Sequence, residues 1–521
     1  MGFFDRFRRK SVAPVRIAPT LGKRNYEAAR PSRIAGGFTS LGYVRSVNEE
    51  IRWDLKGLIA HSRKQAQNND YLKAYFSLVR RNVVGPHGIR FQNMAINTNG
   101  APDKAANDAI EGAFEEWGRK GNCTLDGETS WRGLQELIVP TVARDGSVLV
   151  RVFKGRSYGP FGYQLQVMEI DFLDILTNEM LPNGGSIRLG IEFDADGRRV
   201  AYHLFTRHPG EYMPGRALTR IRVPADQMLL IMRPERPGQI LGVPWNYTAL
   251  RRLNMLHGYE EAAITAARVG ASQMGFYERL PDADAAGKSE LEEGEKSETG
   301  ALVTDFTPGM IEELPMGVSF KAHDPKYPTG EMKPFMQVAL QGAAAGLDVS
   351  YVTLANDLSG ANFSSLRAGK GEERDEWKCL QQWIIEELHQ KVFEQWLPLA
   401  FLSGKLGNLP LSKIEKFAQP RWRPRGWAYV NPGDESTANQ RDMASMLRSP
   451  QEIVAERGAE LEEVFNEIKQ AKELAKSMGL EFNPMAPGHE TAVPMAPGDA
   501  ADEANGTDTA DKPKKPPKGG K

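Results

Sequence analysis

The sequence is poor in cysteine and contains no long apolar run. Its two cysteines, Cys123 and Cys379, are too few for a disulfide framework and fit a reducing compartment. Neither has a second cysteine or a histidine at ligand spacing, so we predict two buried thiols rather than a metal site. The longest apolar stretches, such as residues 228–232, fall far short of the roughly 20 residues that span a bilayer. The sequence therefore predicts no membrane segment.

Net charge is almost absent as well. The chain has 66 lysine and arginine residues against 67 aspartate and glutamate residues, which gives a formal net charge of -1 over 521 residues. A protein that holds nucleic acid tightly usually has a marked basic excess, so this balance argues against a simple nucleic-acid binder. The apolar share of 40% is ordinary for globular proteins, and the chain can bury a sizeable core.

Sequence motifs of enzymes are missing too. No His-Glu-x-x-His, paired-cysteine or Gly-x-Ser-x-Gly pattern occurs. Residues 287–289 resemble the end of a phosphate-binding loop, but Asp282 stands where that motif requires glycine. The eight histidines do not converge at ligand spacing. We therefore expect no catalytic site, cofactor or metal, while a metal site built from carboxylates far apart in the sequence stays open.

Hydrophobic periodicity predicts a mixed body in the first half of the chain. Residues 1–44 form a basic arm in which we expect little regular structure. Helical spacing is found over three segments, 48–84, 101–118 and 130–143. Alternating strand patterns dominate 144–235 and include a hairpin at residues 194–197. Together these patterns predict an α+β body over 45–243.

Two helices rich in small residues follow the body, over 244–274 and 330–347. An acidic, irregular segment separates them over 275–329, with short strands predicted near 301–304, 310–314 and 318–320. Small side chains let neighbouring helices approach closely, although alanine is also simply a good helix former. This order is typical of a subunit that extends two helices from its body, with a small module at their far end.

A loop rich in Gly, Asn and Ser, 356–362, breaks the helical pattern before a third long helix over 365–402. Trp377, Trp383 and Trp396 recur on it at helical spacing, so we expect them in the core rather than as stacking platforms for bases.

The remaining residues divide into three parts. A return strand over 422–430 completes the segment 365–432. Two helices are predicted over 433–480, with a break at Gly458. The repeated Pro-Met-Ala-Pro-Gly within 481–521 indicates a disordered tail without a core.

An ordered set of short segments resembles the lambda family of phage portal proteins. The resemblance covers about residues 69–479. The segments that carry it are 82–85, 88–92, 144–151, 190–197 with 201–202, 233–239 with 242–244, 308–315, 324–325 and 362–367. The family pattern is not followed at 240–241 and 316–317. No single segment is specific for this family, but the occurrence of all of them in this order is specific for it.

This resemblance implies a portal-protein fold with wing, long-helix stem, small α/β clip and helical crown. It assigns 45–243 to the wing, 244–274 and 330–347 to the stem, 275–329 to the clip and 348–364 to the tunnel-loop region. Residues 365–432 are the long helix and the wing return, of which 405–432 belongs to the wing, and 433–480 is the crown. It also implies a ring of about twelve subunits with head-to-tail interfaces, at one capsid vertex. The terminase packages the genome through this DNA channel, and the genome is later ejected through it.

The resemblance further implies partners and site residues. The partners are other copies of the chain, the terminase large subunit, head-completion or adaptor proteins, a major capsid or scaffolding protein, and double-stranded DNA. The location is the virion, and the host cytoplasm during assembly. The residues that it implies make weak contact with DNA are Asn356, Asp357, Leu358, Ser359, Gly360, Ala361, Asn362, Phe363 and Ser364. The residues that it implies pack closely between neighbouring stems are Ala262, Ala263, Ala266, Ala267, Ala343, Ala344 and Ala345.

Two other hypotheses stand beside the portal at this stage. A DNA-processing or packaging enzyme, such as a metal-dependent nuclease, would use dispersed carboxylates and cleave plasmid DNA. A minor head scaffold protein would bind other virion proteins without contacting DNA. Purified rings with a DNA-sized hole favour the portal over both.

Overall fold

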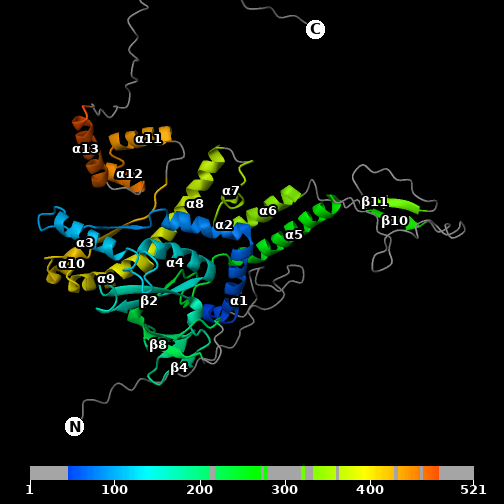
Figure 1. Cartoon of the computed structure of the whole chain (residues 1–521), viewed down its shortest axis with the longest axis horizontal. Helices are drawn as coiled ribbons and strands as arrows, with labels where there is room; N and C mark the ends of the chain where they lie inside the picture. The colour runs from blue at the N-terminus through cyan, green and yellow to red at the C-terminus, as the bar shows by residue number, and fades with distance from the viewer. Residues whose placement is uncertain are drawn as a thin grey trace, which may run out of the picture. The chain divides into compact units, whose positions relative to one another are not determined.

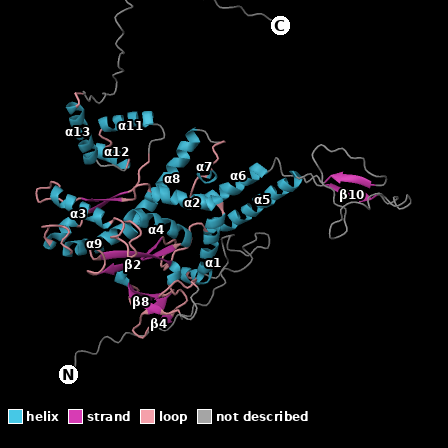
Figure 2. Cartoon of the chain, viewed as in Figure 1, coloured by secondary structure: helices cyan, strands magenta, loops and turns pink. Residues whose placement is uncertain are grey.

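The computed structural model describes residues 45–211, 218–271, 275–279, 318–322, 332–359, 363–427, 432–457 and 461–479 (Figures 1 and 2). The chain divides into two units, residues 1–458 and 459–521. In the second unit the structure describes one helix, α13 (Leu461–Ser477). The described helices include none that is long and apolar enough to cross a membrane. All strands described below belong to the first unit.

A three-stranded antiparallel sheet lies between two hydrophobic cores. β2 (Ser147–Lys154) is its middle strand, between β3 (Tyr163–Glu169) and β9 (Met228–Met232). Val148 and Val150 belong to the first core, and Leu149 between them belongs to the second. Because both faces of the sheet are covered, its middle and third strands are apolar without alternation. The strands predicted from the sequence are confirmed here.

The first core lies under helices and is rich in aromatic rings. The helices that supply it include α2 (Asp70–Val79), α3 (Lys104–Trp117), α4 (Trp131–Asp145), α8 (Phe363–Ile384) and α9 (Lys391–Leu402). Phe114 and Trp396 meet edge to face with their ring centroids 5.0 Å apart. Trp377 and Trp396 are buried, and the half-buried Trp383 donates its indole N–H to the carbonyl of Met232 over 3.1 Å. The predicted core positions of these tryptophans are confirmed.

The second core is enclosed by α1 (Val47–Asn68) and a five-stranded antiparallel sheet. The strands of that sheet, in order, are β4 (Glu179–Met180), β5 (Ser186–Arg188), β6 (Ile191–Phe193), β7 (Arg199–Phe205) and β8 (Arg220–Pro224). The hairpin predicted at 194–197 joins β6 to β7. In it Asp194 accepts hydrogen bonds from the amides of Asp196 and Arg198 at 3.0 and 2.7 Å. Short helical turns occur at Ile170–Phe172, Ala225–Gln227 and Leu411–Lys413, the last followed by α10 (Ile414–Phe417).

Helices α5 (Tyr247–Ala271) and α6 (Met332–Ala345) run side by side away from the sheets (Figure 1). A two-stranded antiparallel pair, β10 (Gly275–Arg279) and β11 (Val318–Ala322), belongs to the segment that connects them. β11 confirms the strand predicted near 318–320, whereas β10 was not predicted. The strands expected near 301–304 and 310–314 lie outside the described residues.

Three predicted helices differ from the structure in detail. The segment 48–84 contains α1, α2 and a π-helical turn at Arg80–Val84, and the side chain of Asn69 caps α2. The helix 365–402 starts at Phe363 and is divided by a π-helical turn at Ile385–Gln390. The crown segment holds three helices, not two. They are α11 (Pro432–Ala444), α12 (Pro450–Glu456) and α13, because Ser449 caps α12 and Pro450 starts it.

Two further predictions are corrected. The return strand is shorter than expected, because β12 (Pro420–Arg423) pairs with β1 (Arg90–Asn93) and stops before Pro424, which has no N–H to donate. Cys123 is buried, as predicted, and burial raises its pKa to about 12. Cys379 is exposed, because it lies on the outer side of α8.

His389 is buried in the π-helical turn before α9. Its Nδ1 lies 3.1 Å from the carbonyl oxygen of Ile384, and its ring meets Trp131 and Trp422 edge-on at 5.2 and 5.0 Å. Burial lowers its pKa from 6.5 to about 4, because a charged imidazolium would lose its hydration there.

This burial predicts a loss of stability in acid. As the pH falls from 6.5 towards 4, the unfolded chain gains a proton at His389 that the folded chain does not accept. We expect this residue to account for up to about 3 kcal/mol of the decrease in unfolding free energy. Urea unfolding of the wild type and His389→Gln at pH 7 and at about pH 4.5 measures it. The variant should lose less stability on acidification, and equal losses would contradict the prediction.

Candidate functional site

The base of α5 is fixed at a buried joint. There residues 242–246 pass along the turn between α4 and β2. The amide of Gly242 donates to Ser147 Oγ over 2.8 Å, and the amide of Trp245 donates to the carbonyl of Ala143 over 2.9 Å. The fully buried side chain of Asn246 is hydrogen-bonded to Ser62 of α1 at 3.0 Å. We call this set of contacts the stem joint.

Asp145 carries a charge inside the stem joint. Its side chain is fully buried and accepts two hydrogen bonds from Arg63 of α1, at 3.1 and 2.9 Å, and two from Arg144, at 2.8 Å each. Burial raises the pKa of Asp145, but the hydrogen bonds from the two arginines outweigh it and hold the pKa below its ordinary value. The carboxylate therefore stays ionised and ties α1 to α4. Sequence patterns do not indicate this contact, because Arg63 lies 82 residues from Asp145.

One cluster of possible metal ligands is found in the part of the chain that the structure describes. Atoms of Glu169, Asp171 and His208 lie within 4.8 Å of one another. Arg63 Nη2 is already 2.5 Å from Asp171 and 3.5 Å from Glu169, and His208 Nε2 is 3.1 Å from Glu169. Because the guanidinium neutralises these carboxylates, we interpret the cluster as an ion-pair network beside the stem joint rather than a metal centre.

Helices α5 and α6 are held together near the joint and leave apolar side chains in solvent farther out. Thr248 Oγ1 donates to the carbonyl of Gly346 over 2.7 Å, and the rings of Tyr259 and Phe335 are 4.8 Å apart. Beyond Leu256, no described side chain of α5 is buried. The apolar side chains left exposed on the pair are Met255 at 66%, Ile264 at 66%, Phe335 at 52% and Val338 at 68%.

The alanines expected to pack between subunits fall into three groups. Ala343 and Ala344 are buried in the first core of their own chain, so their described neighbours lie within the subunit. Ala263 and Ala266 are half-buried. Ala262, Ala267 and Ala345 are exposed and accessible to a neighbouring chain.

The tunnel-loop region 348–364 contains a short helix, α7 (Tyr351–Ala355), and the residues expected to contact DNA, 356–364, follow it. Of these, 356–359 are described before α8, and Asn356 opens them in a left-handed conformation, φ 53°. Asp357 accepts hydrogen bonds from Ser359 Oγ at 2.6 Å, from the amide of Ser359 at 3.0 Å and from Tyr351 Oη at 2.8 Å. These bonds, led by that from the Ser359 hydroxyl, lower its pKa to about 2.

Asp357 therefore carries a negative charge at neutral pH, and Leu358 and Ser359 beside it are exposed. Gly360, Ala361 and Asn362 lie outside the described residues. Phe363 and Ser364 open α8.

Comparison with known proteins decides the family. The family model described as "Phage portal protein, lambda family" matches residues 39–381, well over half of the chain. The chain belongs to the lambda family of phage portal proteins. A curated relative, the probable portal protein of Halomonas phage phiHAP-1, is 33% identical over 501 residues, which cover 95% of this chain and 96% of the relative. Portal proteins are structural components of the capsid, so the chain is not an enzyme.

Solved structures give a more distant likeness. A chain from the neck of an empty GTA particle computed with C6 symmetry is 14% identical, with a TM-score of 0.41 over 78% of this chain and 93% of that one. A chain from the virion of a native gene transfer agent (GTA) particle is 13% identical, with a TM-score of 0.40 and the same coverage.

The stem joint makes a prediction about Gly146. Its φ of 82° is unfavourable for other residues, and a Cβ atom there would lie 2.5 Å from the backbone carbon of Val243. We expect Gly146→Ala to lower the unfolding free energy by at least about 2 kcal/mol. Denaturation followed by tryptophan fluorescence measures it.

The matched control for this substitution is Gly57→Ala in α1, where a Cβ would meet nothing within 4 Å. This control should raise stability by up to about 1 kcal/mol, because alanine is the better helix former. Equal stability of Gly146→Ala and the wild type would contradict the proposed tight approach of the two backbones.

Proposed function

We propose that the chain forms a ring-shaped channel for double-stranded DNA at one capsid vertex, through which the genome is packaged by the terminase and later ejected. The observation that carries this proposal is the pair α5–α6. It is fixed at its base by the stem joint and leaves apolar side chains exposed along its length. Membership of the portal family supports the same role.

The proposed layout follows the order of the elements. Residues 45–243 and 405–432 form the wing, α5 and α6 form the stem, and residues 275–329, with β10 and β11, form the clip. The long helix and the wing return together span 365–432. The tunnel loop is 348–364, and the crown is 433–480, which contains α11, α12 and α13.

Exposed apolar side chains on the stem are the physical reason for a ring. A pair of helices has too little surface of its own to cover Ile264 and Val338, and solvent contact with them is unfavourable. In a head-to-tail ring each stem is flanked by two neighbours, so the same surfaces become buried. The exposed Ala262 and Ala345 then allow close approach between adjacent helices.

The described part of the tunnel loop is suited to weak contact with DNA. Asp357 is ionised and would repel phosphate, while Asn356 and Ser359 offer neutral polar groups. A channel through which DNA moves needs contacts that do not neutralise phosphates, because each such contact strengthens binding steeply.

We propose further partners in keeping with this role. Copies of the same chain complete the ring, which we expect to hold about twelve subunits. The terminase large subunit and head-completion or adaptor proteins bind the clip, and a major capsid or scaffolding protein binds the wing. The protein then functions in the virion at the portal vertex, after assembly in the host cytoplasm.

Ring formation is tested by placing a charge on the stem. Ile264 is exposed within the subunit, so Ile264→Asp should leave the fold intact while introducing a carboxylate into the apolar contact between stems. We expect rings with a central hole for the wild type and mainly single subunits for the variant. Electron microscopy and mass photometry measure both, with Val338→Asp as an independent variant.

The control is Ile264→Val, which keeps an apolar side chain at the same position and should form rings. If Ile264→Asp assembles as well as the wild type, the stem contact is refuted. If the wild type stays a single subunit at every concentration, the proposed function itself is refuted. Rings without a central hole would favour a scaffold role instead.

A further inference from the structure

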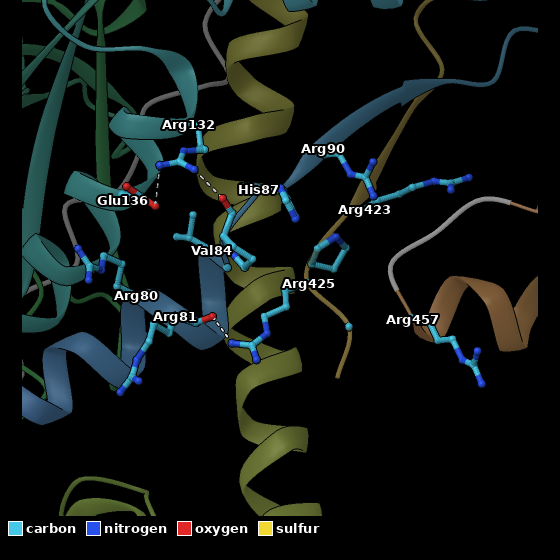
Figure 3. Close-up of a pocket in the computed structure, with 15 residues that line it drawn as sticks. Arg80, Arg81, Val84, His87, Arg90, Arg132, Glu136, Arg423, Arg425 and Arg457 are labelled. Atoms are coloured by element: carbon cyan, nitrogen blue, oxygen red, sulfur yellow. Dashed lines mark hydrogen bonds and ion pairs between the residues drawn. The ribbon is translucent and has the colours of Figure 1, made fainter. Parts of the chain in front are cut away.

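A cavity of about 580 Å³ in the first unit is lined by seven arginines, and we call it the arginine pocket (Figure 3). It lies among the π-helical turn that follows α2, the adjoining residues 85–90, α4 and the end of β12. The one acidic residue in the lining is Glu136, so the formal charge of the lining is +6 with histidine neutral. The whole chain has a net charge of -1, which makes this excess local.

Backbone contacts fix two of the arginines at the pocket. Arg425 Nη1 donates to the carbonyl of Arg81 over 2.5 Å, and Arg132 Nη1 donates to the carbonyl of Pro86 over 2.6 Å. Gly85 allows this approach, because a Cβ there would lie 2.8 Å from the Cβ of Arg425. These carbonyl acceptors are neutral and cancel no charge. The one acidic side chain of the lining, Glu136, lies 3.5 Å from Arg132 Nη2 and pairs with it.

The fold also accepts like charges close together at this site. Arg90 and Arg423 are directly opposite each other in the pairing of β1 with β12, where two like charges are unfavourable. Burial lowers the pKa of Arg425, and the charges of Arg81 and Arg374 lower it further. An anion bound among these groups would relieve the repulsion and stabilise the folded chain.

We propose that the arginine pocket binds the phosphate backbone of double-stranded DNA outside the channel. The inference rests on the proposed function, in which genomic DNA passes through the ring that these subunits form. Arginine binds phosphate oxygens with two parallel N–H donors, and phosphates repeat along a duplex at a spacing that several arginines can follow. Arg457 also lines the pocket, and it is the C-terminal cap residue of α12 in the proposed crown.

An acidic peptide fits the pocket less well than DNA does. Peptide docking usually depends on buried apolar anchors, and the lining offers Val84 and two prolines besides its glycines and charged side chains. Val84 is itself 1% exposed and already belongs to the first core. Little apolar surface is therefore left for a peptide side chain.

The test measures DNA affinity of the full chain by fluorescence anisotropy with a labelled duplex of about 30 base pairs, between about 50 and 200 mM salt. The test variant is Arg80→Gln/Arg81→Gln, because both side chains are exposed and line the pocket. The control is Arg156→Gln/Arg198→Gln, which removes two exposed arginines outside it. Each double substitution is also measured in the Ile264→Asp background, so that DNA binding is compared between ring-forming and single subunits.

We expect the Arg80/Arg81 variant to bind the duplex at least about tenfold more weakly, with a dependence of log affinity on log salt that is shallower by about two. The control should change neither quantity, and both variants should still form rings. The same pattern should hold in the Ile264→Asp background, because the pocket lies within one subunit.

Three results would overturn the proposal. They are unchanged affinity of the Arg80/Arg81 variant, an equal loss in the control, and tighter binding of a polyglutamate peptide than of the duplex at the same salt. The last would identify an acidic peptide as the ligand. Absence of rings in the wild type would refute the proposed function alone, because anisotropy reports on the pocket in either assembly state.

Discussion

The stem joint is the constraint on which the extended part of the molecule depends. Gly146 and Gly242 approach so closely that a Cβ on Gly242 would lie 2.1 Å from the carbonyl oxygen of Gly146. Asp145 holds α1 and α4 beside this contact, and Asn246 continues it to the first turn of α5. The 25 residues of α5 make a lever of about 38 Å. A small change of angle at the joint would displace the far end of the helix by several ångströms, so the joint must be rigid.

Apolar surface is distributed in opposite ways in the body and in the stem. In the body, β2 contributes alternate side chains to two cores, so a single strand is covered on both faces and the sheet is stiff. In the stem, no described side chain of α5 beyond Leu256 is buried, and Ile264 faces solvent. The body is therefore complete as one subunit, whereas the stem becomes complete only through assembly. This difference explains how a subunit folds before the ring exists.

The parts of the structure that the sequence predicts are those set by local patterns. A β-branched run predicted β2 and alternation predicted β3, the Asp-rich hairpin predicted the β6–β7 turn, and helical spacing placed the tryptophans of α8 and α9. The parts that it missed depend on residues far apart in the chain. Arg63 and Asp145 are 82 residues apart, and β1 pairs with β12 more than 300 residues later. The helix and strand periodicities that a sequence shows are local, so they do not indicate such long-range pairings. The expected loop and stem roles stay predictions, and the arginine pocket could not be seen because separate segments supply its arginines.

The near-zero net charge has a different meaning once the charges are placed in the fold. In the proposed tunnel loop, the described residues present the ionised Asp357 and neutral side chains, which favours weak contact with DNA. The lining of the arginine pocket carries an excess of six positive charges, and backbone carbonyls position two of its arginines. On these two proposals, one chain lets DNA slide at one surface and holds it at another. A total of -1 is compatible with both, because binding to DNA depends on where charges gather and not on their sum.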